Sequence, residues 1–360
     1  MNQYSYRFPR LVAECHAMLL RLSGWIPDGL ISEARDRLVA EDLQSLARTV
    51  SLAVVERGVP LTDRDADLLA GVLTGCGLDA GPLSRVPRQA TEPVPTWDFA
   101  PAPLTALRTG GDRIGRCLDL TDDQDLTISP DLLDDRDRTM IDLVAGRPGC
   151  LGLWRTWRFP PTGSPGRRVY LIEVTPRTDP SMLALRAQVA LSDQGEISPQ
   201  IETYASGSPL PLYQRTARAW SSLLWASTPP HLIHRAPVYD TIDPGTGPRF
   251  APDHPLLTDI YLRERLTGYL TSATLVRAND VLRDDIVDPA RRATVPWNFR
   301  TDGAWIWSDA LAYYLREHGL APTGDFLDHL RTASARPPEL DSVTTFRARA
   351  TLHRKQSPMP

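Results

Sequence analysis

A proline-rich stretch between Gly81 and Gly111 sets the strongest limit on how this chain can fold. Its six prolines have no backbone N–H to donate, so the stretch can form neither a long helix nor a central strand. Before it, apolar residues recur at helical spacing; after Gly149, they alternate as in strands. The sequence therefore predicts an α+β protein with helices first and strands later.

Residues 9–79 have the pattern of four short helices. In "RLVAECHAMLLRLSG" the apolar residues fall on one helical stripe, and Gly24 is a natural stop. Gly58 ends the next helical stretch, and Thr62 precedes a helix with aspartates in its first turn. Four helices joined by short links predict a helical bundle over residues 1–80.

Residues 81–148 are expected to connect this bundle to the next domain. The proline-rich part predicts an extended linker that touches that domain through Trp97 and Phe99. The part from 112 to 148 is strongly acidic and predicts a solvated connector with a short helix.

Residues 149–335 are predicted to form a mixed α/β sandwich domain. "GLWRTWRF" and "RRVYLIEV" flank a turn-forming segment and predict a β-hairpin. Helices are expected over 179–193, 211–227 and 255–270, and strands over 199–206 and near 234–242. Residues 336–360 are interpreted as a C-terminal tail.

The segment 295–322, "VPWNFRTDGAWIWSDALAYYLREHGLAP", predicts a hairpin followed by a helix capped by Ser308 and ended by Gly319. With residues 301–303 as the loop, Phe299 would lie opposite Trp305 and Trp297 opposite Trp307. All four aromatics would then share one buried face. The alternative is an aromatic cage or a partner-binding surface.

In either reading, three polar residues of this segment are candidates for a ligand or partner surface: Asn298, Arg300 and His318.

Residues 229–255 carry side chains suited to metal binding or acid–base chemistry. The candidates are His231, His234, Asp240, Asp253 and His254. Imidazole and carboxylate groups bind zinc or iron, and a loop can bring them together. The two-residue gap between the first two histidines differs from the helical zinc-protease spacing, and the glycines and prolines here also suit an ordinary turn-rich loop. Both readings stay open.

Several classes of protein are excluded or disfavoured by composition. Lys355 is the only lysine, and its place in a polar tail disfavours P-loop, protein-kinase and Schiff-base mechanisms. A net charge of −4 argues against a nucleic-acid partner. With no apolar run long enough for a membrane span and no leader pattern, we expect a cytoplasmic protein without a membrane partner. Glu173 and Glu202 fall on predicted strands, but nothing in the sequence fixes their separation.

Three segments resemble a group of actinobacterial proteins of unknown function. They are "SGSPLPLYQRTARAWSSLLWA", "RAPVYDTIDPGTGPRFAPDHP" and the hairpin segment quoted above. The resemblance lies mainly after residue 150. It implies a GC-rich bacterial origin and a cytoplasmic setting, and it implies no activity or cofactor.

Two functional hypotheses follow from these patterns. The first is a non-enzymatic interaction or regulatory component of a bacterial multi-gene system, without a cofactor, whose residues 1–80 bind a protein partner. The second is a metal-dependent or acid–base hydrolase that uses the histidines and aspartates of the 231–254 loop.

Overall fold

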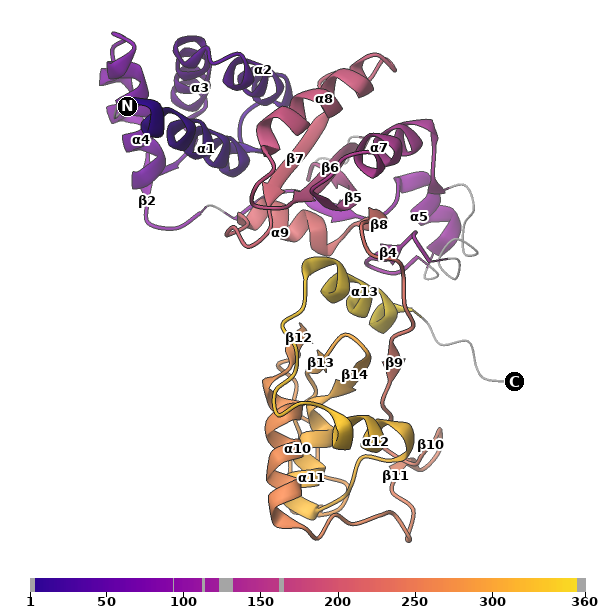
Figure 1. Ribbon diagram of the computed structural model, residues 1–360. Coiled ribbons are helices and arrows are strands. Elements are labelled where there is room, and N and C mark those ends of the chain that lie inside the picture. The colour runs from indigo at the N-terminus through magenta and orange to yellow at the C-terminus, as the bar shows by residue number, and fades with distance from the viewer. Residues whose placement is uncertain (1–3, 93, 112–113, 123–131, 162–164, 355–360) are drawn as a thin grey trace. The chain divides into compact units, whose positions relative to one another are not determined.

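The structure is a computed structural model that describes residues 4–92, 94–111, 114–122, 132–161 and 165–354 (Figure 1). Helices combined with mixed sheets confirm the α+β class, and the N-terminal helices precede the sheet region. Contacts between residues divide the chain into two compact units, Met1–Pro229 and Pro230–Pro360. This division lies inside segment 149–335, for which the sequence predicts one domain. Lys355 lies outside the described residues.

The first unit begins with four helices around a common apolar core, α1 (Tyr4–Leu22), α2 (Asp28–Val39), α3 (Leu43–Arg57) and α4 (Asp63–Gly75). Their local signals behave as predicted. Gly58 ends α3 in the left-handed region with φ +60°, and the Thr62 side chain accepts a hydrogen bond from the Asp65 N–H at 3.2 Å. The core includes Met18, Leu19 and Ile31, which are fully buried.

The proline-rich segment lies against its surroundings at several points. After the short 3-10 helix η1 (Gly81–Arg85), β2 (Arg88–Gln89) pairs in parallel with β1 (Leu61–Thr62). Trp97 donates a hydrogen bond from Nε1 to the Gly24 carbonyl at 2.8 Å, and Phe99 is buried. The hydrogen bond of Trp97 thus reaches the N-terminal helices, and its contact with the following domain is with Arg158, whose guanidinium carbon lies 4.2 Å from the ring centroid. β3 (Asp98–Ala100), which contains Phe99, pairs with the main sheet through β5.

The acidic segment is only partly solvated. It contains β4 (Leu118–Asp119) and α7 (Asp135–Ala145), and residues 112–113 and 123–131 lie outside the described part. A short helix is thus present as expected, preceded by α5 (Leu104–Gly110). Asp119 and Asp137 are buried, and Asp137 accepts hydrogen bonds from Arg155 and Tyr170. These two aspartates differ from the predicted solvated connector because each buried carboxylate has hydrogen-bond donors, Arg155 and Tyr170 of the sheet for Asp137 and the nearby Thr121 for Asp119.

The sheet of the first unit has the strand order β4-β8-β5-β6-β7, with β3 paired to β5 (Figure 1). β5 (Cys150–Phe159) and β6 (Arg167–Val174) form the predicted antiparallel hairpin. α8 (Pro180–Ser192) then leads to β7 (Gln200–Ala205), which runs parallel to β6.

The prediction of one helix over 211–227 is wrong in its second half. α9 (Leu212–Ala219) ends early, and β8 (Ser222–Ala226) follows it between β4 and β5. A short apolar run such as "SSLLWA" fits either a buried strand or a buried helix, so its periodicity could not decide. Leu223 and Leu224 are both buried, on the two faces of the sheet.

The second unit is built on a sheet with the order β12-β13-β14-β9. Its strands are β9 (His234–Arg235), β12 (Thr274–Arg277), β13 (Phe299–Thr301) and β14 (Trp305–Ser308), and a separate hairpin joins β10 (Thr241–Asp243) to β11 (Gly247–Arg249). The helices are α10 (Ile260–Ser272), α11 (Asp309–His318), α12 (Gly324–Thr332) and α13 (Ser342–His353). α13 occupies part of the segment predicted as a tail, and its Phe346 and Ala348 are buried.

The predicted register of the β13–β14 hairpin is wrong. Phe299 pairs with Ser308 and Arg300 with Trp307, so the loop is one residue longer than expected. The Asp302 carboxylate explains the longer loop, because its Oδ1 accepts hydrogen bonds from the N–H groups of Ala304 and Trp305 at 3.0 and 2.9 Å. Ser308 stands opposite Phe299 in place of Trp305, a shift by an odd number of residues. The side chains of β14 therefore lie on the opposite face, relative to those of β13, from the predicted one.

The aromatics of the hairpin are consequently divided between two faces. Trp305 and Trp307 pack with residues of α10 and α12, whereas Phe299 packs with Ile306 and Val276. They are core residues, as one of the two readings expected, but they do not form one face. Ser308 and Gly319 act as predicted, as the N-cap of α11 and as its left-handed stop at φ +71°.

Candidate functional site

The 231–254 candidates form one close pair in the second unit. His254 Nδ1 lies 2.8 Å from Asp240 Oδ2, and His254 Nε2 lies 2.9 Å from the Ala321 carbonyl oxygen. The same Asp240 oxygen accepts a hydrogen bond from the Ala251 N–H at 2.7 Å. Both ring nitrogens of His254 thus have partners. The pair joins the loop segments around Asp240, His254 and Ala321 to one another.

The other candidates of this loop have separate surroundings. His231 Nε2 lies 3.0 Å from the Gly303 carbonyl oxygen, and the His234 ring stacks on Trp305 with ring centroids 4.8 Å apart. Asp253 is exposed. Within the described ranges, no group of three or more His, Cys, Asp or Glu side chains is arranged to hold a metal ion.

The candidate surface residues bond inside the second unit. Asn298 donates from Nδ2 to Asp309 Oδ2 at 2.8 Å, and Arg300 donates from Nε to Asp309 Oδ1 at 2.7 Å. His318 Nε2 lies 2.6 Å from Asp285 Oδ2. These contacts join the hairpin and α11 to neighbouring segments, and the three residues do not converge on one surface group.

A further histidine–aspartate pair escaped the sequence analysis. His329 Nε2 lies 2.6 Å from Asp302 Oδ2, which also accepts a hydrogen bond from the Tyr269 hydroxyl at 2.8 Å. The partners come from α12, the hairpin loop and α10, and no spacing in the sequence relates them. Because Asp302 also caps its own loop, this cluster has a clear structural role.

The first unit contains a cavity of about 640 Å³ that the sequence did not indicate. Its main walls are residues 8–21 of α1, residues 176–181 before and at the start of α8, and residues 204–211 at the end of β7 and after it, and Glu41 also lines it. Most of the lining is apolar, and five lining residues are prolines, Pro9, Pro176, Pro180, Pro209 and Pro211. Its volume lies within the usual range of small-molecule sites, and prolines limit the rearrangement of its walls.

His16 is the most unusual polar residue of this cavity. It is buried on α1, and its Nε2 lies 2.8 Å from the Thr203 carbonyl oxygen. Since a carbonyl can only accept, Nε2 carries the proton. Burial lowers the pKa of His16 below its usual value, so the ring is neutral and Nδ1 is an unprotonated acceptor. Nδ1 is buried and has no hydrogen-bond partner among the described residues.

The polar groups beside His16 are held in a buried network. Arg35 donates from Nη2 to Glu202 Oε2 at 2.8 Å, and that oxygen also accepts from Ser23 and from Gln214, at 3.0 and 2.9 Å. Glu202 lies on β7 next to Thr203. The network therefore connects the N-terminal helices to the sheet at the base of the cavity.

Glu173, the other strand glutamate considered from the sequence, pairs with Arg218 at 3.4 Å. Each glutamate thus has its own arginine, and the two do not act as a pair of catalytic carboxylates.

Three of the other titratable side chains that line the cavity have structural partners, and Glu41 and Arg177 line it as well. Arg21 pairs with Asp65, Asp179 caps α8 through the Ser181 N–H, and the Tyr204 hydroxyl accepts from Arg218. The cavity therefore combines a mainly apolar lining with the buried acceptor of His16 and with the charged side chains of Glu41 and Arg177, a lining suited to binding a small molecule.

Comparisons with models of protein families, with curated proteins and with solved structures give no match. No helix of the described segments has the length and apolar character that a membrane span requires.

Proposed function

We propose that this protein is a non-enzymatic, cytoplasmic regulatory component that binds a small, mainly apolar molecule in the α1 cavity. The observation that carries the proposal is the buried His16 Nδ1, an acceptor with no partner among the described residues in a mainly apolar lining. A buried acceptor left unsatisfied costs about 1–3 kcal/mol. A ligand with one O–H or N–H group would remove that cost.

The same geometry suggests how binding would be transmitted. His16 lies on α1, and its hydrogen bond to Thr203 joins α1 to β7. A ligand seated there would favour one arrangement of the N-terminal helices against the sheet. The expected protein partner of residues 1–80 would bind that arrangement preferentially. Ligand binding in the cavity would then regulate partner binding by the N-terminal helices.

The hydrolase hypothesis has weaker support. A hydrolytic site needs a nucleophile or activated water together with an acid or base in one cavity. Of the five 231–254 candidates, all within the described part of the chain, His254 and Asp240 are hydrogen-bonded to each other, and both nitrogens of His254 are already engaged.

The proposal can be tested with 2-naphthol, a neutral fluorescent probe with one hydroxyl donor, and 2-methoxynaphthalene, which lacks the donor. Full-length protein should bind 2-naphthol more tightly by about 2- to 10-fold, the value of one hydrogen bond. His16→Leu should remove that preference. His16→Gln should retain part of it, because an amide can donate to Thr203 and still offer an acceptor.

Two results would reject the proposal. One is equal affinity of both probes for the wild type. The other is an unchanged preference for 2-naphthol in a folded His16→Leu variant.

A further inference from the structure

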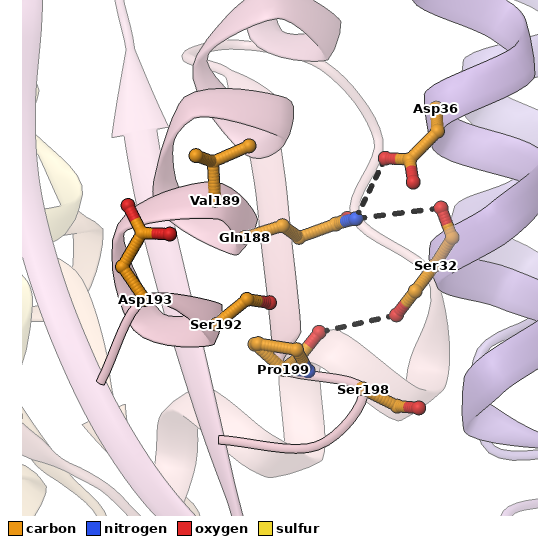
Figure 2. Close-up of a pocket in the computed structure, with 8 residues that line it drawn as sticks. All are labelled: Ser32, Asp36, Gln188, Val189, Ser192, Asp193, Ser198 and Pro199. Carbon is orange, nitrogen blue, oxygen red and sulfur yellow. Dashed lines mark hydrogen bonds between the residues drawn. The ribbon is translucent and has the colours of Figure 1, made fainter. Parts of the chain in front are cut away.

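A second cavity in the first unit lies between α2 and α8. Its lining is mainly polar and acidic, whereas that of the α1 cavity is mainly apolar. Its volume is about 320 Å³. Figure 2 shows α2 contributing Ser32 and Asp36, and α8 with the segment before β7 contributing the other wall.

The lining of this cavity is electronegative. It contains the carboxylates of Asp36 and Asp193, the hydroxyls of Ser192 and Ser198, and no Arg, Lys or His. In Figure 2 the two carboxylates lie at opposite ends of the group. The arginines that flank Asp36 in sequence have other partners, since Arg35 pairs with Glu202 and Arg37 with Glu33.

Gln188 provides an independent sign that a donor is needed. Its side chain extends from α8 toward α2, where Nε2 donates to Asp36 Oδ1 at 3.0 Å and to the Ser32 carbonyl at 3.3 Å (Figure 2). Both partners are acceptors, which fixes the amide nitrogen on that side. Gln188 is 4% exposed, and its Oε1 is buried with no partner among the described residues.

The geometry points to a binding site for a small organic cation, with an ammonium or guanidinium group placed between Asp36 and Gln188 Oε1. Such a group brings several N–H donors and a positive charge, which match a carboxylate, an amide oxygen and hydroxyls. The side chains of Val189 and Pro199 offer apolar contact for a short carbon chain.

The same residues are poorly suited to a metal ion. Only two carboxylates line the cavity, and the described residues hold no group of three or more potential His, Cys, Asp or Glu ligands. An organic cation needs fewer protein ligands because it supplies its own directional donors. Burial raises the pKa of Asp36, and it outweighs the opposing effects of the Arg37 charge and of the hydrogen bond from Gln188.

This site goes beyond the function proposed above and does not depend on it, because the two cavities share no lining residue. A cation bound here would bridge α2 and α8. It would thereby strengthen the attachment of the N-terminal helices to the sheet.

The test is isothermal titration of full-length protein with n-butylammonium and agmatine, with n-butanol as the uncharged comparison. Wild type should bind at least one of the two cations and not the alcohol, and its affinity should fall with added salt. Asp36→Asn, which preserves shape, should weaken binding at least tenfold. Asp193→Asn should weaken it less, and Glu56→Gln, an exposed position on α3 away from the cavity, should not change it.

Melting temperatures of the three variants would show that each is folded. The site is overturned if neither cation binds the wild type, if butanol binds as well as the cations, or if folded Asp36→Asn binds like the wild type.

Discussion

Arg35 Nη2 lies 2.8 Å from Glu202 Oε2, and the two side chains are 1% and 0% exposed. Neither ion can be solvated by water, so each depends on the other and on Ser23 and Gln214 for compensation. Such a pair adds little net stability compared with apolar side chains, but losing one partner is costly. We therefore expect the pair mainly to fix the position of the N-terminal helices against β7.

Breaking this pair on one side should be far more damaging than replacing both ions. Glu202→Leu leaves the Arg35 charge buried alone and should lower the free energy of unfolding by about 3–5 kcal/mol. The double variant Arg35→Met, Glu202→Leu should recover most of that loss. Urea unfolding of both variants measures the difference, and a double variant no more stable than the single one would contradict the expectation.

His16 should make the first unit sensitive to mild acid. Burial lowers the pKa of His16 in the folded protein. Below about pH 6.5 this histidine therefore binds a proton in the unfolded chain but not in the folded protein. Stability should therefore fall as the pH drops from 7 to 5, by up to about 1.4 kcal/mol per pH unit. His16→Gln cannot titrate and should show a flatter profile in urea unfolding at pH 5, 6 and 7. Identical slopes would contradict this origin.

Asp285 should produce a separate acid response in the second unit. Burial alone would raise its pKa, but hydrogen bonds from His318, the Val287 and Asp288 N–H groups and Tyr313 outweigh burial and lower it. Its stabilising contribution is present above the unfolded pKa of about 4 and is lost as the pH falls below that value. Hydrogen exchange of α11 amides should report this loss, which Asp285→Asn should remove. A persistent loss in Asp285→Asn would assign the response to other carboxylates.

Two glycines of the second unit should respond oppositely to alanine. Gly319 has φ +71° after α11, where a side chain is strained, so Gly319→Ala should destabilise by about 1 kcal/mol. Gly268 lies within α10, and an added Cβ would meet nothing within 4 Å, so Gly268→Ala should stabilise by about 0.5–1 kcal/mol. Melting temperatures of the two variants, measured together, test the pair. Shifts of the same sign would refute it.

Metal content separates the two functional hypotheses. We expect protein purified without chelators to carry no stoichiometric metal, and we expect EDTA to leave its melting temperature unchanged. His254→Ala should still destabilise the second unit, because it removes the contacts with Asp240 and Ala321. Bound zinc or iron that disappears in His234→Ala, His254→Ala would instead support the hydrolase.

The sequence was most informative where a single short segment decides the outcome. Thr62, Ser308 and Gly319 are recognisable because a cap depends on one side chain and the next few backbone groups. The β5–β6 hairpin was predicted for the same reason, since strong alternation on both sides of a turn leaves few other arrangements.

The β13–β14 register failed because one hydrogen-bonding side chain altered the loop length. The predicted three-residue loop uses Asp302 only as a turn residue. Its carboxylate, however, accepts hydrogen bonds from two N–H groups and from the Tyr269 hydroxyl, and it also contacts His329. The last two partners lie on other helices and could not be known from the hairpin. Aromatic pairing energies are too small to outweigh such a network.

The α1 cavity could not be predicted from the sequence, for a related reason. His16 and Thr203 are 187 positions apart, and the cavity has walls from three separate segments. In the helical pattern of α1, nothing distinguishes His16 from an ordinary polar residue of an amphipathic helix. Only the fold shows that its partner is a backbone carbonyl, which no sequence motif encodes.

α13 has a consequence for how the protein is made. Its Ala348 and Leu352 pack in a core with Ile233, Val276 and Ile306, so the second unit lacks one wall until residues 342–353 have left the ribosome. By then the whole of the first unit has been synthesised and can already be folded. During translation, the unfinished second unit is thus the stage most exposed to chaperones and proteases, and a premature stop before residue 342 would leave an apolar sheet face for quality control to recognise.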